Sequence, residues 1–168
     1  VVNGTQCTVA WYVDDTKISH VDPAVVTDFI RQIEERFGNM TVTRGKEHTF
    51  LGMTIKFNDD ETVSIRMPTY LQEAITDSGL DIRKKATTPA KSSLFEAKDN
   101  LPLLPKAQLE TFHSIVAKLL YVSIRARPDI LLPISYLCTR VAKANVEDQQ
   151  RLQRVLEYLY GTMHLSLR

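Results

Sequence analysis

The sequence has little cysteine, almost no net charge and no long hydrophobic run. No segment reaches the roughly 18 consecutive apolar residues that a membrane-spanning helix requires, and no secretory signal is visible. The two cysteines, Cys7 and Cys138, are far apart and lack metal-site spacing, so we expect reduced core residues in an intracellular protein that does not contact membranes. The net charge of +1 means that any nucleic-acid binding must come from local basic clusters.

The residues that are present are typical of a folded protein. The composition, with 43% hydrophobic and 24% charged residues, is typical of a globular protein. The length of 168 residues is enough for one ordinary domain or two small ones. The chain begins with Val1 and opens directly on strand-like sequence, so we expect a fragment of a longer protein.

Two adjacent acids interrupt a strand-like stretch near the start of the chain. Residues 7–13 are rich in β-branched and aromatic types, and residues 16–19 can return as a second strand. The pattern predicts a hairpin with Asp14 and Asp15 at or near its turn. Because Val9 to Val13 are largely apolar, we expect the acids to lie where a buried sheet ends.

A helix and two further strands are predicted before residue 68. Asp22 is a suitable N-cap and Gly38 a suitable stop for an amphipathic helix that covers a sheet. Residues 49–57 and 62–67 are predicted as strands joined by a polar turn, which contains the second Asp-Asp pair, Asp59-Asp60.

Helical patterns dominate the rest of the sequence. Thr69 and Gln72 predict a capping box for a short helix that ends near Gly79, and residues 81–104 read as a linker. From Pro105 the apolar positions recur at helical spacing. The punctuating residues of this helical part are Pro128, Pro133, Asn145 as a cap and Gly161 as a stop. The sequence therefore predicts an α+β fold with a strand-rich part up to about residue 67 and an all-helical part from about residue 105.

Adjacent carboxylates repel each other, and a cation removes that cost. Carboxylates are hard oxygen ligands of the kind that Mg²⁺ prefers. Enzymes that join nucleotides hold two such ions roughly 3.5–4 Å apart. The alternative for Asp14 and Asp15 is an ordinary solvated turn, which is how we interpret Asp59-Asp60.

Six segments of the sequence resemble, in order, motifs of copia-type retrotransposon reverse transcriptases. They match the catalytic hairpin of the palm, the primer grip, a TP segment, the thumb helix, an RPDI turn and a YLKGT ending. The segments are Tyr12-Val13-Asp14-Asp15, Phe50-Leu51-Gly52-Met53-Thr54-Ile55, Thr88-Pro89-Ala90, residues 112–121, residues 125–130 and residues 158–162.

The resemblance implies part of an RNA-directed DNA polymerase. It implies a partial palm over residues 1–67, a short helix and linker over 68–104, and a helical thumb or connection region over 105–168. The cofactor would be Mg²⁺, with Mn²⁺ as a substitute. The partners would be an RNA or DNA template with a DNA primer, deoxynucleoside triphosphates, and an upstream fingers and palm segment of the same polyprotein. The expected location is the cytoplasm, in retrotransposon particles.

The resemblance also implies roles for individual residues of the palm. Asp14 would be a catalytic metal ligand and Asp15 the second acid of the site. The implied substrate- and primer-binding residues are Tyr12, Val13, Leu51, Gly52 and Met53. A strand glycine such as Gly52 lets another backbone approach closely, although it is also typical of a bulge.

In the thumb-like helix, the implied nucleic-acid-binding residues are His113, Ala117 and Tyr121. The family typically has glycine where this chain has Ala117, which is a departure from the pattern. Packing on the next helix is the alternative role of Tyr121. Three basic runs, each of which is by default solvated surface, could also meet phosphates: residues 44–46, 83–85 and 125–127.

Parts of a complete polymerase site are missing from the sequence. Nothing acidic precedes Asp14, whereas the two-metal site of the family needs an earlier palm aspartate. We therefore predict that the chain alone is inactive, and that the unpaired edge of Val9 to Val13 promotes aggregation. Two alternatives remain open: a non-catalytic nucleic-acid-binding remnant of a decayed element, and a helical protein-interaction module at residues 105–168.

Overall fold

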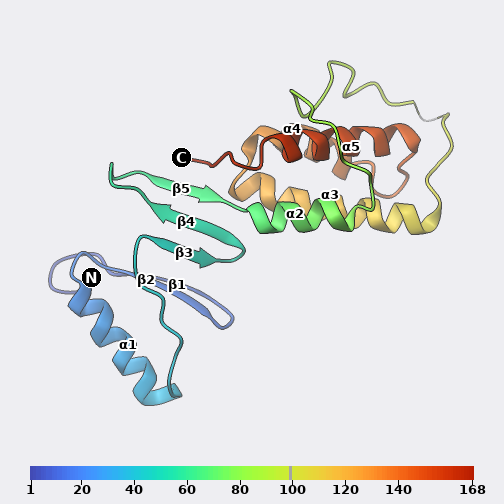
Figure 1. The fold of residues 1–168 in the computed structure, drawn as a ribbon. Coiled ribbons are helices and arrows are strands. Elements are labelled where there is room, and N and C mark those ends of the chain that lie inside the picture. The colour runs from blue at the N-terminus through green and yellow to red at the C-terminus, as the bar shows by residue number, and fades with distance from the viewer. Residues whose placement is uncertain (99) are drawn as a thin grey trace. The chain divides into compact units, whose positions relative to one another are not determined.

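The computed structural model describes residues 1–98 and 100–168 and divides the chain into two compact units (Figure 1). Unit 1 comprises Val1–Leu51, and unit 2 comprises Gly52–Arg168. Five α-helices and two small antiparallel sheets are present among the described residues, which confirms the predicted mixture of strands and helices. The assignment of palm, linker and thumb stays a prediction.

Unit 1 contains the predicted hairpin with the two acids. Strands β1 (Thr8–Tyr12) and β2 (Asp15–Ser19) pair antiparallel, with Tyr12 opposite Asp15. The expected burial is wrong, because every residue of β1 is exposed and Trp11 is 79% exposed. A two-stranded sheet has no neighbouring strands to complete a core layer. Cys7, expected in the core, is a free and only half-buried cysteine.

Helix α1 (Pro23–Phe37) has the predicted ends. The Asp22 carboxylate accepts a hydrogen bond from Ala24 N at 2.8 Å, and Gly38 has a φ of 90°. No residue of α1 is fully buried, and Phe37 is 82% exposed. The helix-on-sheet layer that the sequence predicts is therefore not formed in full.

The strand predicted over residues 49–57 is interrupted. The structure has β3 (Glu47–Phe50) and β4 (Met53–Phe57) with a turn between them. Consecutive positive φ values, 52° at Leu51 and 73° at Gly52, cause the break. The leucine hides this turn from sequence analysis, because its type rarely adopts a positive φ.

In unit 2, β4 pairs antiparallel with β5 (Val63–Arg66), and the predicted polar turn joins them. The end of the chain also joins this sheet. Leu167 exchanges two backbone hydrogen bonds with Ile65, at 2.8 and 2.9 Å, and Arg168 forms an ion pair with Asp60. The hairpin of β4 and β5 is thus bonded to the last residues of the chain.

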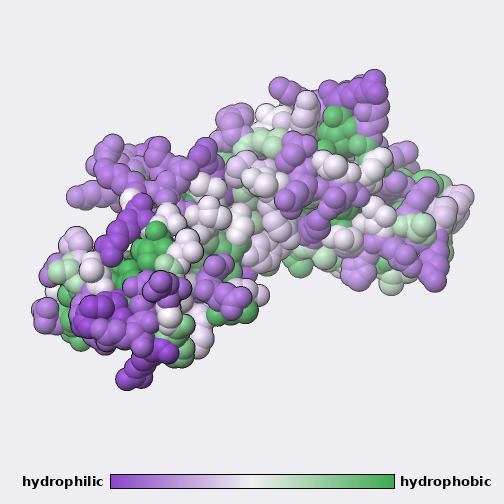
Figure 2. All heavy atoms as spheres, turned by 60° about the horizontal axis from the view of Figure 1, so that its bottom comes forward, coloured by the Kyte–Doolittle hydropathy of each residue, from purple (hydrophilic) through white to green (hydrophobic). Residues whose placement is uncertain are grey.

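The helices of unit 2 surround the main apolar core. Residues 112, 115, 116, 119 and 122 of α3 and residues 152, 155, 156 and 159 of α5 supply much of it. The helices are α2 (Pro68–Asp77), α3 (Lys106–Arg125), a 3-10 turn (Pro128–Ile130), α4 (Leu131–Cys138) and α5 (Val146–Gly161). Hydrophilic residues cover most of the face in Figure 2, with separate small hydrophobic patches.

The caps of α2 and α5 give opposite results. The capping box predicted at Thr69 is wrong, because α2 begins one residue after Met67, which makes no side-chain cap bond and is buried. Asn145 caps α5 as predicted: its Oδ1 accepts from the backbone N–H groups of Glu147 and Asp148 at 3.0 and 3.1 Å. The Asp148 carboxylate accepts from Asn145 N in return, which completes a capping box.

The segment predicted as a linker, 81–104, contains no helix or strand in its described residues. It is nevertheless packed, since Leu94 and Leu104 are buried and Leu104 N donates to Ala144 O at 2.9 Å. Cys138 is half-buried, and burial raises the pKa of its thiol. None of the helices in the described part is long and apolar enough to cross a membrane.

Candidate active site

The turn of the unit 1 hairpin consists of Val13 and Asp14. Because Tyr12 pairs with Asp15, these two residues form the whole loop. Val13 has a φ of 49°, a conformation that two-residue hairpin loops usually reserve for glycine or asparagine and that β-branched residues rarely adopt. The Trp11 indole Nε1 donates a hydrogen bond to Val13 O at 2.6 Å, which helps to hold this strained turn.

Both carboxylates of the hairpin are exposed, and neither the Asp14 nor the Asp15 side chain has a hydrogen bond or ion pair with another described residue. The second Asp-Asp pair differs. Asp60 accepts hydrogen bonds from Thr62 Oγ1 at 2.6 Å and from Arg168. The hydrogen bonds from Thr62, and then the positive charge of Arg168, lower the pKa of its carboxyl group. The structure thus confirms a turn role for Asp60 and leaves the hairpin carboxylates available to a cation.

The donor chemistry of the hairpin fits Mg²⁺ in part. Two adjacent carboxylates are suitable hard oxygen ligands. However, the described residues contain no group of three or more His, Cys, Asp or Glu side chains that could hold a metal ion. Asp14 and Asp15 could therefore supply only part of a metal site, and the remaining ligands would have to come from elsewhere.

Gly52 lies in a two-residue turn with Leu51, and not in the β-bulge that was the alternative interpretation of this glycine. A Cβ atom at Gly52 would lie 3.5 Å from Met67 Cε and 3.7 Å from Tyr70 Cδ2, which is ordinary contact. The glycine is therefore required by its φ of 73° and not by lack of space. Met53 is half-buried and packs against the core of unit 2.

The three predicted residues of α3 differ in exposure. His113 and Ala117 are exposed, whereas Tyr121 is half-buried. The Tyr121 ring lies 5.5 Å from that of Tyr70, centroid to centroid, and the Arg125 guanidinium lies 3.7 Å above it. Tyr121 thus stacks on Tyr70 of α2 and packs, half-buried, against the core of unit 2.

Tyr70 was missed by sequence analysis, although it lies beside two of the predicted residues. It is next to Gly52 and stacks on Tyr121, so one aromatic side chain links the turn at Gly52 with the predicted duplex-facing helix. Only its place at the start of a short helix marked it in the sequence. The structure brings Gly52 and Tyr121 into one neighbourhood through Tyr70.

The basic run at residues 125–127 is divided between two roles. Arg125 packs over an aromatic ring, but the side chain of Arg127 is buried and ion-paired with Asp129 at 2.7 Å. Arg127 is therefore not available to a phosphate. Of the third basic run, only Arg125 could therefore contact a phosphate.

Comparison with known proteins finds similarity to transposon sequences. The chain is 27% identical over 162 residues to the protein YCL074W of Saccharomyces cerevisiae, which is assigned to transposon Ty5-1; the match covers 95% of this chain and 51% of that protein. It is 28% identical over 163 residues to the retrovirus-related Pol polyprotein from transposon RE1 of Arabidopsis thaliana, covering 90% of this chain and 10% of the polyprotein. These similarities support a protein derived from a retrotransposon polyprotein.

A further relative is the uncharacterized mitochondrial protein AtMg00810 of Arabidopsis thaliana, with 28% identity over 160 residues, 93% of this chain and 62% of that protein. The chain thus spans between half and two thirds of the two shorter relatives. No family model matches the chain. No solved structure matches it either.

Proposed function

We propose that this chain is the C-terminal part of the polymerase domain of a copia-type reverse transcriptase. The observation that carries the proposal is the hairpin: the motif Tyr12-Val13-Asp14-Asp15 ends one strand, forms a two-residue turn and begins the next. Two exposed carboxylates without internal partners lie at this turn. The similarity to a retrovirus-related Pol polyprotein supports the same assignment.

In this proposal each part of the chain has a role in primer extension. Asp14 and Asp15 would hold Mg²⁺, which would supply positive charge near the primer hydroxyl and the pyrophosphate leaving group. The rigid turn fixes the two carboxylates, and Tyr12 and Val13 lie beside the primer end. The turn at Leu51 and Gly52 positions the primer backbone.

The helical part of the chain has the second role. His113 and Ala117 are exposed on α3 and face the template–primer duplex in this proposal. Tyr121 offers only part of its ring, because Tyr70 and Arg125 cover the rest. The methyl group of Ala117 keeps the duplex farther from the helix backbone than a glycine at this position would.

The chain by itself lacks an earlier palm aspartate and a triphosphate-binding segment. A pair of carboxylates binds Mg²⁺ weakly, because this ion gives up its water reluctantly. We therefore propose that polymerase activity requires the upstream fingers and palm segment of the same polyprotein.

The test is incorporation of labelled deoxynucleotides on an RNA template with a DNA primer. The protein would be this chain together with the upstream part of its reading frame. Asp14→Asn removes one carboxylate charge from the hairpin. Asp59→Asn is the matched control, because it makes the same change in the other Asp-Asp turn.

We expect Mg²⁺-dependent incorporation that is lost in Asp14→Asn and retained in Asp59→Asn. Incorporation that survives Asp14→Asn would show that the hairpin is not the active site. A duplex-binding protein that incorporates nothing, and whose duplex affinity falls steeply with salt but does not depend on Mg²⁺, would favour the non-catalytic remnant. Specific binding to a protein instead of a duplex would favour the interaction module.

A further inference from the structure

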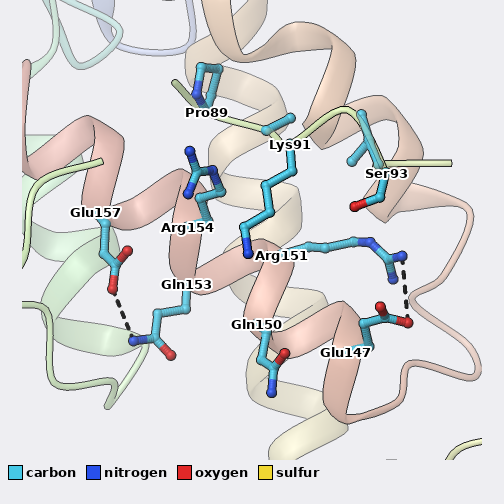
Figure 3. A pocket seen from close by; sticks show the side chains of 11 residues that line it. Pro89, Lys91, Ser93, Glu147, Gln150, Arg151, Gln153, Arg154 and Glu157 are labelled. Atoms are coloured by element: carbon cyan, nitrogen blue, oxygen red, sulfur yellow. Dashed lines mark hydrogen bonds and ion pairs between the residues drawn. The ribbon is translucent and has the colours of Figure 1, made fainter. Parts of the chain in front are cut away.

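A polar groove lies between residues 89–94 and one face of α5, within unit 2 (Figure 3). Its volume is about 260 Å³. One wall is the loop that follows Thr88, and the other wall consists of side chains from successive turns of α5. The polar side chains that line it are Lys91, Ser93, Glu147, Gln150, Arg151, Gln153, Arg154 and Glu157.

The two acids of the groove are already engaged. At one end, Glu157 Oε1 accepts a hydrogen bond from Gln153 Nε2 at 3.1 Å. At the other end, Glu147 forms ion pairs with Lys98 at 3.3 Å and with Arg151 at 3.6 Å. The charge of Glu147 is therefore balanced by two cations, whereas Glu157 is held by a neutral amide.

One of the three cations is engaged as well. Arg151 Nη1 lies 3.1 Å from an oxygen of the buried Asp148 carboxylate, and Arg151 Nη2 donates to Glu96 O at 2.6 Å. Arg151 also forms an ion pair with Glu147, so it contacts two carboxylates of α5. Its positive charge is balanced within unit 2.

Arg154 and Lys91 are different. Arg154 Nη2 donates to Thr88 Oγ1 at 2.9 Å, but Arg154 Nε is buried without a hydrogen-bond partner. Lys91 extends from the loop across α5 between Arg154 and Arg151, and no described residue pairs with its ammonium group. A buried donor without an acceptor is costly, so a ligand that supplies acceptor oxygens would be stabilised here.

We propose that this groove binds a phosphate group, with Lys91 and Arg154 as its charged ligands. A guanidinium donates to phosphate oxygens with its planar edge and an ammonium binds as a point charge, so the pair suits a tetrahedral anion. Ser93 and Gln150 line the same space and offer neutral donors. The volume is below the roughly 300 Å³ at which pockets for whole small molecules begin, which favours a single phosphate with its immediate substituent.

The proposal goes beyond polymerase activity, because the groove contains neither Asp14 nor any other residue of the hairpin. The phosphate can come from a free phosphorylated molecule or from the backbone of a polynucleotide. The test separates these sources with two probes, inorganic phosphate and a short single-stranded DNA, titrated into the chain by calorimetry.

Four variants complete the design. Lys91→Gln and Arg154→Gln each remove one cation of the groove, and Lys143→Gln makes the same charge change outside it. Thr88→Val removes the Arg154–Thr88 hydrogen bond without changing the charge, and so separates a loss of local structure from a loss of binding. Thermal unfolding of each variant shows whether it is folded.

We expect phosphate affinity to fall roughly tenfold in Lys91→Gln and in Arg154→Gln, and to be retained in Lys143→Gln. In the unaltered chain, the NMR resonance of Arg154 Nε–H, identified by its absence in Arg154→Gln, should move on addition of phosphate. DNA affinity that falls in the same variants identifies a polynucleotide as the source, and unchanged DNA affinity identifies a small phosphorylated molecule. Equal losses in Lys143→Gln, a stationary Nε–H resonance, or no binding of either probe would overturn the proposal.

Discussion

Arg127 and Asp129 form an ion pair in which Arg127 Nη2 lies 2.7 Å from Asp129 Oδ2 and the arginine is buried. The same guanidinium donates to Thr162 O at 3.0 Å, and Tyr158 Oη donates to Asp129 Oδ2 at 2.8 Å. Two segments that the sequence singled out separately, residues 125–130 and 158–162, therefore meet in one network. Their residues hold the turn before α4 to the end of α5.

Arg127→Ala should lower the free energy of unfolding of unit 2 by about 3 kcal/mol. The substitution removes the ion pair with Asp129 and two hydrogen bonds to Thr162. Urea unfolding followed by circular dichroism measures the change. Arg125→Ala is the matched control, since this arginine lies on the surface of an aromatic ring and should contribute less than about 1 kcal/mol. Equal losses in both variants would contradict a special role for the network.

The Asp129 network should make stability depend on acidic pH. Burial raises the pKa of Asp129, but hydrogen bonds from Arg127 and Tyr158 outweigh it and leave the pKa below the usual value. A carboxyl group with a lowered folded-state pKa stabilises the fold above its unfolded pKa of about 3.9, and this contribution is lost as the pH falls through the folded pKa.

The comparison with Asp129→Asn isolates that contribution. The difference in free energy of unfolding between the two proteins should be constant near neutral pH and should shrink below about pH 4. Urea unfolding over a series of pH values measures it. A difference that stays constant down to the lowest pH would show that the pKa of Asp129 is not lowered.

The α5 cap should be measurable by substitution of Asn145. Asn145→Ala removes the oxygen that accepts from Glu147 N and Asp148 N, and should cost about 1 kcal/mol. It also removes the bond from Asn145 Nδ2 to Lys98 O. Asn145→Ser keeps a capping oxygen but loses that amide donor, so a smaller loss in Asn145→Ser than in Asn145→Ala would attribute the difference to the cap.

Gly52→Ala should destabilise the chain by about 1–2 kcal/mol, because alanine is strained at a positive φ. Gly79→Ala is the control: its φ is 64°, and nothing lies within 4 Å of a Cβ there. We expect similar losses of stability in urea unfolding. If Gly52 also approaches a primer, primer affinity of the longer polymerase should fall in Gly52→Ala and not in Gly79→Ala.

The exposed hairpin should make the chain prone to aggregation. Among the strands that the structure describes, β1 pairs only with β2, and its exposed side chains include Val9 and Trp11. Trp11→Lys places a charge on this surface and should reduce light scattering at micromolar concentration. Monomeric behaviour of the unaltered chain under the same conditions would argue against an edge that needs a partner.

Local signals predicted the parts of the fold that depend on neighbouring residues. Asp22 and Asn145 mark helix starts because a cap bonds to the backbone two or three residues away. Pro133 falls in the first turn of α4, where a missing N–H is harmless. The hairpin around Asp14 was found for the same reason.

Contacts between residues far apart in the sequence could not be predicted from local patterns. Arg127 appeared in a basic run, and its acceptor on Thr162 is 35 positions away. The stacking of Tyr70 on Tyr121 likewise joins two helices separated by a long segment. The burial expected at Val9 to Val13 failed because apolar character predicts burial only where other strands complete the layer.

The pairing of Leu167 with Ile65 has a mechanical consequence. Ile65 also pairs with Ile55 in β4, so β4 and the segment at Leu167 lie on either side of β5. A pulling force applied between the two ends of unit 2 would act first on the backbone hydrogen bonds of β5 with β4 and with Leu167, and only then on the helices. The helical core would therefore remain folded until the small sheet opened.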